Sequence, residues 1–255
     1  MQNIQVTSID DNIASLRIST DDQPYIEEGF APALADAVAE LKRNEHLRVV
    51  IVEGGARYFS AGASIDSLVS SDEKTGAPTY AAELPGLVLS VPVPTIAAMA
   101  GHAIGGGWIL GLWCDIALLA EESMYGANFM ALGFTPGMGA TMIVEEWVGA
   151  SLARELLFTG RLVKGRELKY VGSPLAHAII PRAEVRDRAL AIAMEIAQVP
   201  RDSLLLLKTA LAEQRRERLE RVLRAERSMH QTVFSQPTTP RQIAERYAAS
   251  LSQDD

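Results

Sequence analysis

The stretch PTIAAMAGHAIGGGWILGLWCDIALLA at residues 94–120 decides the fold. Residues 94–99 predict a strand, the glycines at 105–107 open a helix over Trp108–Trp113, and Ile116–Leu119 predicts a further strand. Backbone N–H groups at such a helix start can bind an anion or stabilise a developing oxyanion. Equally, the glycines can simply allow close packing of helix on sheet. The spacing does not match the G-x-G-x-x-G dinucleotide fingerprint.

The preceding residues repeat the alternation of strand and helix. Ile4–Thr7 and Ile13–Ile18 predict two strands joined by a turn, and Ala31–Leu41 has apolar residues at helical spacing. The run Val49–Val52 is apolar throughout, as expected for a strand covered on both faces. The chain is therefore predicted to be α/β with a parallel sheet.

Composition excludes several classes of function. The 255 residues carry 24 Lys and Arg against 32 Asp and Glu, a net charge of −8, which argues against nucleic acid or an anionic membrane as partner. Cys114 is the single cysteine and there are four histidines, so a disulfide framework and a closed zinc site are not expected. Prolines and glycines interrupt the apolar stretch Val91–Leu119, and Met1–Asp10 has no signal-peptide pattern. We expect a cytoplasmic protein.

A second glycine-bearing turn follows the strand at Val49–Val52. Residues 59–65 read FSAGASI and place small side chains after an aromatic one. Two such turns at the carboxyl ends of neighbouring parallel strands can direct two backbone N–H groups at one carbonyl oxygen. This favours an oxyanion hole over a purely structural role for the glycines.

Four motifs in this order resemble the crotonase (enoyl-CoA hydratase/isomerase) superfamily: FSAGASI at 59–65, GHAIGGG at 101–107, CDI at 114–116 and GFTPGMG at 133–139. The resemblance implies a spiral of ββα units, with a core at 1–199 and a helical region at 200–255 that builds homotrimers or hexamers. It further implies that the amides of Ala63 and Gly106 stabilise a thioester enolate.

Departures from the family pattern argue against hydration. By the family resemblance, Ile109 and Phe129 occupy the positions of the two catalytic glutamates of hydratases. Adding water needs a base and an acid, and apolar side chains provide neither. Glu121 and Glu122 lie in a predicted exposed turn, where solvated charge is the simpler role.

The replacements predict an apolar pocket lined by Trp108, Ile109, Phe129 and Phe134, with Asn128 as a polar exception. Such a pocket destabilises a carboxylate more than a delocalised anion and so favours decarboxylation. The run 125–139 resembles the second enoyl-CoA-hydratase-like enzymes of polyketide β-branching cassettes. That resemblance implies loss of CO2 from a 3-methylglutaconyl thioester on acyl carrier protein, giving a 3-methylcrotonyl thioester.

In that subfamily a loop lysine and a histidine on a C-terminal helix act on the substrate, and Lys74 and His230 are the matching residues. His230 shares a helical face with Glu226, which can orient or charge it. A solvated loop lysine and a core histidine are the simpler alternatives. Tyr80 either closes the pocket or is a residue that packs against neighbouring side chains.

No metal or bound cofactor is implied, because the substrate arrives on the phosphopantetheine of acyl carrier protein or on CoA. The tail arginines Arg215, Arg216, Arg218 and Arg221 either pair with nearby glutamates on a solvated helix or dock an acidic carrier protein. We expect His102 to hydrogen-bond the backbone of its loop and Cys114 to pack as a small hydrophobic side chain. The family resemblance implies trimer contacts around Met138–Ala153. His46 is predicted to lie at the surface and His177 to be structural.

Two other functions fit the same motifs. A double-bond isomerase acting on a CoA or carrier thioester needs the oxyanion hole and one acid/base group. A catalytically idle crotonase-like subunit that serves assembly or thioester binding would also lack both glutamates.

Overall fold

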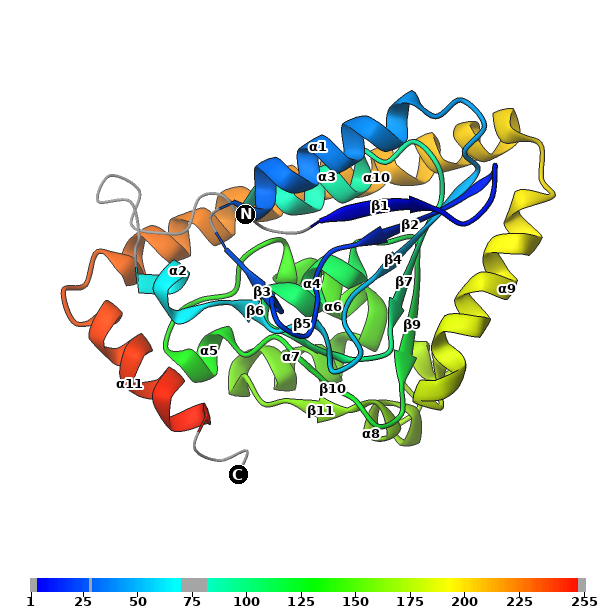
Figure 1. Cartoon of the computed structure of the whole chain (residues 1–255). Helices are drawn as coiled ribbons and strands as arrows, with labels where there is room; N and C mark the ends of the chain where they lie inside the picture. The colour runs from blue at the N-terminus through cyan, green and yellow to red at the C-terminus, as the bar shows by residue number, and fades with distance from the viewer. Residues whose placement is uncertain (1–3, 28, 70–81, 252–255) are drawn as a thin grey trace.

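The computed structural model describes residues 4–27, 29–69 and 82–251, and its strands form two larger sheets and a short pair (Figure 1). The six-stranded sheet has the order β1-β2-β4-β7-β9-β12 and the four-stranded sheet the order β11-β10-β8-β5. The strands of the six-stranded sheet are β1 (Gln5–Ser8), β2 (Ile13–Arg17), β4 (Val49–Glu53), β7 (Thr95–Met99), β9 (Ile116–Ala120) and β12 (Ile179–Ile180). The others are β3 (Tyr25–Ile26), β5 (Tyr58–Ser60), β6 (Gly62–Ala63), β8 (His102–Ile104), β10 (Met124–Gly126) and β11 (Val163–Lys164).

The strands predicted from apolar runs are confirmed in the six-stranded sheet. Its first two strands pair antiparallel and the remaining neighbours pair parallel, with Val50 opposite Thr95 in β4 and β7. Every residue of β4 and of β7 is buried, as the absence of polar alternation predicted. The predicted α/β class is therefore confirmed.

The second sheet was not predicted from periodicity, because its strands are only two or three residues long. His102–Ile104, expected to be a turn, forms β8 and pairs parallel with both β5 and β10. The chain therefore leaves β7, bends at Gly101 and makes a second short strand before the helix begins. The two glycine-bearing turns are consequently neighbours, since β5 and β8 precede them side by side.

The helices surround these sheets (Figure 1). Their bounds are α1 (Phe30–Arg43), α2 (Ile65–Val69), α3 (Leu84–Leu89), α4 (Gly106–Leu112), α5 (Phe129–Leu132), α6 (Ala140–Val148), α7 (Ala150–Thr159), α8 (Gly165–Tyr170), α9 (Val185–Ala197), α10 (Arg201–Phe234) and α11 (Thr239–Leu251), with 3-10 turns at Pro174–Ala178 and Arg182–Glu184. α9 packs on β4 and β7 from one side, whereas the wholly buried α4 lies between the two sheets. No described helix is long and apolar enough to cross a membrane.

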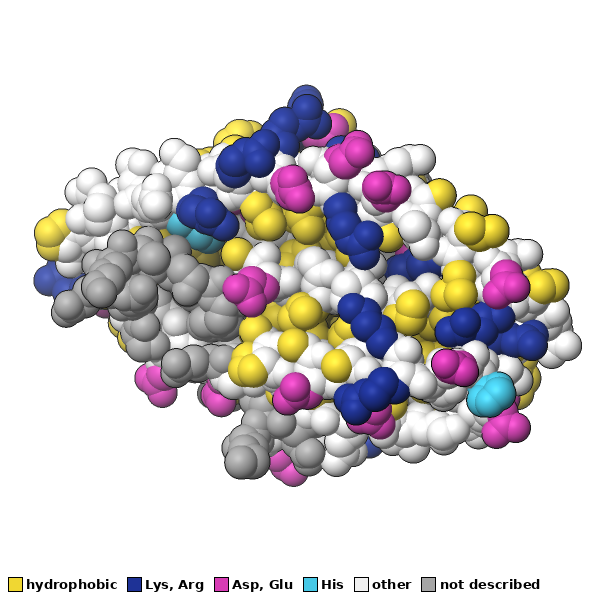
Figure 2. All heavy atoms as spheres, turned by 90° about the horizontal axis from the view of Figure 1, so that it is seen from above, with side chains coloured by type: hydrophobic (Ala, Val, Ile, Leu, Met, Phe, Trp, Pro, Cys, Tyr) yellow, Lys and Arg dark blue, Asp and Glu magenta, His cyan; other side chains and the backbone are white. Residues whose placement is uncertain are grey.

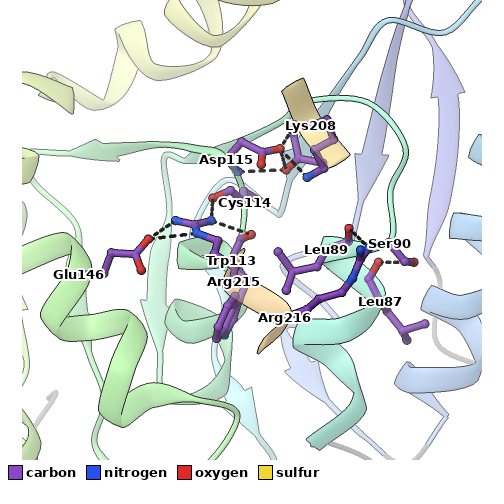
Figure 3. Close-up of polar contacts among 11 residues, drawn as sticks. Leu87, Leu89, Ser90, Trp113, Cys114, Asp115, Glu146, Lys208, Arg215 and Arg216 are labelled. Atoms are coloured by element: carbon purple, nitrogen blue, oxygen red, sulfur yellow. Dashed lines mark hydrogen bonds and ion pairs between the residues drawn. The ribbon is translucent and has the colours of Figure 1, made fainter. Parts of the chain in front are cut away.

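The largest element of the predicted helical region at 200–255 is α10, which runs without interruption from Arg201 to Phe234. Polar contacts fasten its first half to the core (Figure 3). The ammonium of Lys208, 4 % exposed, lies 2.7 Å from Oδ2 of Asp115, which also accepts hydrogen bonds from the N–H and hydroxyl of Thr95. Arg215 donates to Glu146 and to the carbonyl of Cys114. Because these contacts join α10 to β7, β9 and α6, the helix is fixed relative to the core.

The buried Lys208–Asp115 pair gives a test of this attachment. Removing one partner of a buried ion pair leaves the other charge uncompensated, so we expect Lys208→Ala to lower the free energy of unfolding by about 3 kcal/mol. Urea unfolding followed by circular dichroism at fixed protein concentration measures the change. The matched control is Arg218→Ala, which removes an exposed ion pair to Glu146 and should cost about 1 kcal/mol or less. Equal losses in the two variants would contradict the assigned role of Lys208.

Candidate active site

A cavity of about 560 Å³ opens between the two glycine-bearing turns and α10. Its described lining is mostly apolar and comes from β3, β6, α2, α5, α10 and α11. The lining residues are Ile26, Ala61, Gly62, Ala63, Leu68, Ala82, Glu83, Gly105, Gly106, Asn128, Phe129, Leu132, Phe134, Gly137, Met138, Leu223, Glu226, Arg227, His230, Gln231 and Tyr247. This size and character suit an acyl chain with a few polar groups.

The two turns meet at one end of the cavity. Gly62 has φ +78°, and a Cβ there would lie 2.6 Å from the carbonyl oxygen of Ile104 and 3.5 Å from the amide nitrogen of Gly106. Gly105 has φ +54°, so both turns use backbone conformations that favour glycine. Ala63 and Gly106 therefore lie on adjoining turns, and both line the cavity as the sequence predicted.

The glycine triplet also serves close packing. A Cβ on Gly107 would lie 2.6 Å from the carbonyl oxygen of Ser60, so α4 can approach β5 only with glycine at this position. The sequence left open whether the glycines serve close packing or present backbone N–H groups to an anion. Gly107 serves packing, whereas Gly105 and Gly106 line the cavity, where an amide can meet a ligand.

His230 projects from α10 into the cavity, and its Nε2 lies 2.7 Å from the carbonyl oxygen of Thr135. A carbonyl only accepts, so Nε2 carries the proton and Nδ1 keeps its lone pair in the neutral ring. Burial lowers the pKa of His230, partly offset by the backbone hydrogen bonds. Its ring also packs edge-on against Phe134 and Phe234. His230 is therefore neutral in an apolar setting.

The turn Gly137-Met138-Gly139 is shaped around this ring. A Cβ on Gly137 would lie 2.7 Å from Cε1 of His230, and one on Gly139 would lie 2.6 Å from the indole of Trp113. Met138 has a positive φ of 61°, unusual for a residue with a side chain, and its carbonyl accepts a hydrogen bond from Trp113. The indole contact holds this conformation, which places Met138 in the cavity wall.

Glu226 does not orient His230, contrary to the sequence-based expectation. Its carboxylate accepts hydrogen bonds from the N–H groups of Gly139 and Thr141 and from the Thr141 hydroxyl, at 2.7, 3.0 and 2.7 Å. These groups lie at the N-terminus of α6, where a carboxylate is stabilised by unpaired N–H groups and the helix dipole. Burial raises the pKa of Glu226, and the same hydrogen bonds oppose that rise. Glu226 is a helix cap supplied by another helix.

The prediction that Trp108 and Ile109 line the pocket is wrong. Trp108 and Ile109 are fully buried and do not line the cavity. The reason is that α4 enters the space between the sheets directly after Gly106, so its later side chains pack into the core. Asn128, Phe129 and Phe134 do line the cavity, as predicted.

Two further predicted residues, Lys74 and Tyr80, lie outside the described residues. Their contribution to the cavity remains a prediction.

Sequence reasoning missed several lining residues. Leu223, Arg227 and Gln231 are spaced by four along α10 and flank Glu226 and His230, a signal that was available from helical periodicity. Tyr247 of α11 was not predictable in this way, because it reaches the cavity through the tertiary packing of α11 on α2 and α5. Burial, followed by the interaction with Tyr25, raises the pKa of Tyr247.

Other titratable residues have structural roles. Nδ1 of His102 accepts a hydrogen bond from the amide of Met124, so the ring binds backbone as expected, but it joins strands β8 and β10 and does not lie in a loop. Cys114 is fully buried, and burial followed by the nearby Asp115 raises its pKa to about 12. The surface prediction for His46 is confirmed, and His177 is exposed with Nδ1 3.1 Å from the carbonyl of Pro174. Glu121 and Glu122 lie in a turn and pair with Lys169 and the amide of Arg182.

The predicted basic cluster on α10 is largely engaged within the protein. Arg215 pairs with Glu146, and Arg216 donates to the carbonyl of Leu89 (Figure 3). Arg218 also pairs with Glu146. On the face seen in Figure 2, basic and acidic side chains are interspersed over the side where α1 and α10 lie. The ion-paired alternative is therefore favoured over a basic docking face at these residues.

The two sheets, the adjoining turns and the long C-terminal helix over an apolar cavity together define a protein of the crotonase fold. The enoyl-CoA hydratase/isomerase family model matches residues 11–249, and the chain belongs to this family.

Relatives within this family include decarboxylases. The chain is 38 % identical over 226 residues to the bacillaene synthase decarboxylase PksI of Bacillus subtilis (strain 168), covering 87 % of this chain and 89 % of that protein. Its fold matches the ECH2 decarboxylase domain of CurF from Lyngbya majuscula with a TM-score of 0.86 and 31 % identity, covering 96 % of this chain and 99 % of that one. A chain from a dehydratase/decarboxylase enzyme couple involved in polyketide β-branching gives 0.86 and 35 %, covering 94 % and 98 %.

The environment of His230 predicts its titration. Because burial lowers its pKa, the ring should titrate below the usual range of histidine and remain neutral, as the Nε2–H tautomer, at neutral pH. A pKa lowered on folding stabilises the native state above the unfolded-state pKa, and this contribution is lost as the pH falls through the folded-state pKa. NMR of protein with 15N-labelled histidine measures both properties, with His230→Gln assigning the signal. A ring already protonated at pH 7 would refute the assignment.

Proposed function

We propose that this protein decarboxylates a 3-methylglutaconyl thioester to a 3-methylcrotonyl thioester in polyketide β-branching. The observation that carries the proposal is an apolar cavity with His230 in its wall, whose described lining offers no buried carboxylate free to activate water. Glu226 is committed to capping α6, and Glu83 is exposed. The similarity to PksI and to the CurF ECH2 domain, both named decarboxylases, supports the same reaction.

The reaction needs a place for the electrons that CO2 leaves behind. When the C–C bond to the carboxylate breaks, its electron pair moves through the conjugated double bond onto the thioester oxygen, giving a dienolate. The N–H groups of Ala63 and Gly106, on adjoining turns, are assigned to stabilise that oxygen. A proton then adds to carbon, and the apolar wall of Phe129 and Phe134 favours the delocalised anion over the carboxylate.

His230 is suited to both steps. Burial lowers its pKa, and a substrate carboxylate beside it would raise that pKa, so that binding brings a proton into the site. The imidazolium then holds the carboxylate and afterwards can protonate the dienolate. Lys74 is proposed as a second cation for the same purpose, with the division of roles between the two left open.

The proposal extends to the carrier and the assembly. The substrate is taken to be attached to the phosphopantetheine of an acyl carrier protein or to CoA, and no other cofactor is required by the chemistry. We further propose a homotrimer or hexamer and a cytoplasmic location, on the strength of the family resemblance and of polyketide β-branching relatives.

One assay separates this function from the isomerase and the idle subunit. Mass spectrometry of carrier-bound 3-methylglutaconyl thioester incubated with the protein reports CO2 loss as a lower mass. Conversion at unchanged mass, with the double bond moved, would instead indicate an isomerase. Binding without any conversion would indicate an idle subunit.

Replacing His230 tests its role in this reaction. We expect His230→Gln to slow CO2 loss by about 100-fold or more, because a general acid contributes two or more orders of magnitude. The rate is measured from the mass change under single turnover. The matched control is His177→Gln at the exposed 3-10 turn, which should react at the wild-type rate. Near-normal turnover in a folded His230→Gln protein would exclude the assignment.

A further inference from the structure

We propose that Arg227 binds the carboxylate of the acyl group at the mouth of the cavity and so selects dicarboxylic acyl thioesters. The inference rests on the proposed function and names a substrate-binding residue for it. It does not depend on where Lys74 lies.

The placement of Arg227 follows from the geometry of α10. Leu223, Glu226, Arg227, His230 and Gln231 all line the cavity, and their spacing of three and four residues makes one face of the helix. Arg227 is exposed and lies three residues before His230, whose ring is partly buried. A carboxylate next to His230 is therefore within reach of the flexible guanidinium side chain at the cavity mouth.

The charges around the cavity leave Arg227 available. Among the described lining residues, the acidic and basic side chains besides the imidazole of His230 are Glu83, Glu226 and Arg227. Glu226 is bound to the N-terminus of α6, and no ion pair joins Glu83 to Arg227. Arg215 and Arg218, by contrast, are paired with Glu146. Within the described part of the chain, Arg227 is thus a cation that faces the cavity without an ion-pair partner.

The chemistry of the substrate supplies the missing partner. A guanidinium presents paired N–H donors that match the two oxygens of a carboxylate. Because Arg227 is exposed, water weakens its interaction with the substrate carboxylate. The contact therefore stabilises the bound carboxylate only modestly, so it slows the loss of CO2 little. Arg227 should therefore act mainly on substrate binding and His230 on the chemical step.

Binding of unreactive analogues isolates this contact. The 3-methylglutaryl thioester of pantetheine keeps the carboxylate but lacks the double bond that receives the electrons, and the isovaleryl thioester lacks the carboxylate as well. We expect Arg227→Gln to weaken binding of the 3-methylglutaryl thioester by about tenfold, the loss expected for one charge-assisted hydrogen-bonding contact, and to leave isovaleryl binding unchanged. Isothermal titration calorimetry measures both affinities. Arg227→Lys should recover part of the loss.

The matched control is Arg224→Gln, an exposed arginine one turn earlier on α10 that does not line the cavity, and it should bind both thioesters as the wild type does. With the reactive substrate, Arg227→Gln should raise KM more than it lowers kcat. Equal weakening of both acyl thioesters would overturn the proposal. The same two acyl groups are also measured as CoA thioesters. If Arg227→Gln weakens binding of the CoA thioesters alone, whatever the acyl group, the contact is to a phosphate and the proposal is likewise overturned.

These outcomes are separable from failure of the proposed function. If the wild-type protein binds the 3-methylglutaryl thioester through Arg227 yet releases no CO2 from the 3-methylglutaconyl thioester, decarboxylation is rejected and the carboxylate contact stands.

Discussion

The hydrogen bonds from the N-terminus of α6 to Glu226 hold the candidate active site together. The turn before α6 must contain glycine at position 139, because a side chain there would collide with Trp113 and the residue has φ +76°. A glycine cap offers no side chain for the unpaired N–H groups of the helix. The carboxylate of Glu226, from α10, takes that place and binds Gly139 and Thr141 at once. The contact that caps the N-terminus of α6 thus also fixes the position of α10 relative to the cavity.

This dependence explains why a distant C-terminal helix can place an imidazole accurately. α10 is anchored at its first half by the buried Lys208–Asp115 pair and at its second half by Glu226. His230 is one turn beyond that second anchor, and its Nε2–H is directed at the carbonyl of Thr135. The turn 133–139 therefore contacts the helix twice, through a carboxylate and through a ring, and both the cavity wall and its histidine are set by one rigid unit.

Motifs and periodicity were sufficient for five strands of the six-stranded sheet, all except β12, and for the long tail helix. With the family resemblance they also indicated that Ala63, Gly106, Phe129, Phe134 and His230 face one cavity. They failed where tertiary packing decides. Trp108 and Ile109 follow the glycines directly in sequence, yet α4 turns both into the core. Glu226 shares a helical face with His230, but the unpaired N–H groups of α6 compete for its carboxylate. Neither outcome is visible without knowing which element lies opposite.

Commitment of Glu226 to a helix cap also bears on which reaction the fold can perform. Hydration needs an acid and a base beside the enolate, yet Ile109 and Phe129 occupy the two positions where the family resemblance places glutamates. The carboxylate of Glu226, which lines the cavity, already accepts three hydrogen bonds. His230 lies in the cavity wall in largely apolar surroundings, and burial lowers the pKa of its ring. A nearby negative charge raises the pKa of an imidazole, so a substrate carboxylate favours protonation of His230. A substrate that carries a carboxylate therefore promotes protonation of the imidazole that later protonates the dienolate. A thioester without a carboxylate does not raise the imidazole pKa in this way.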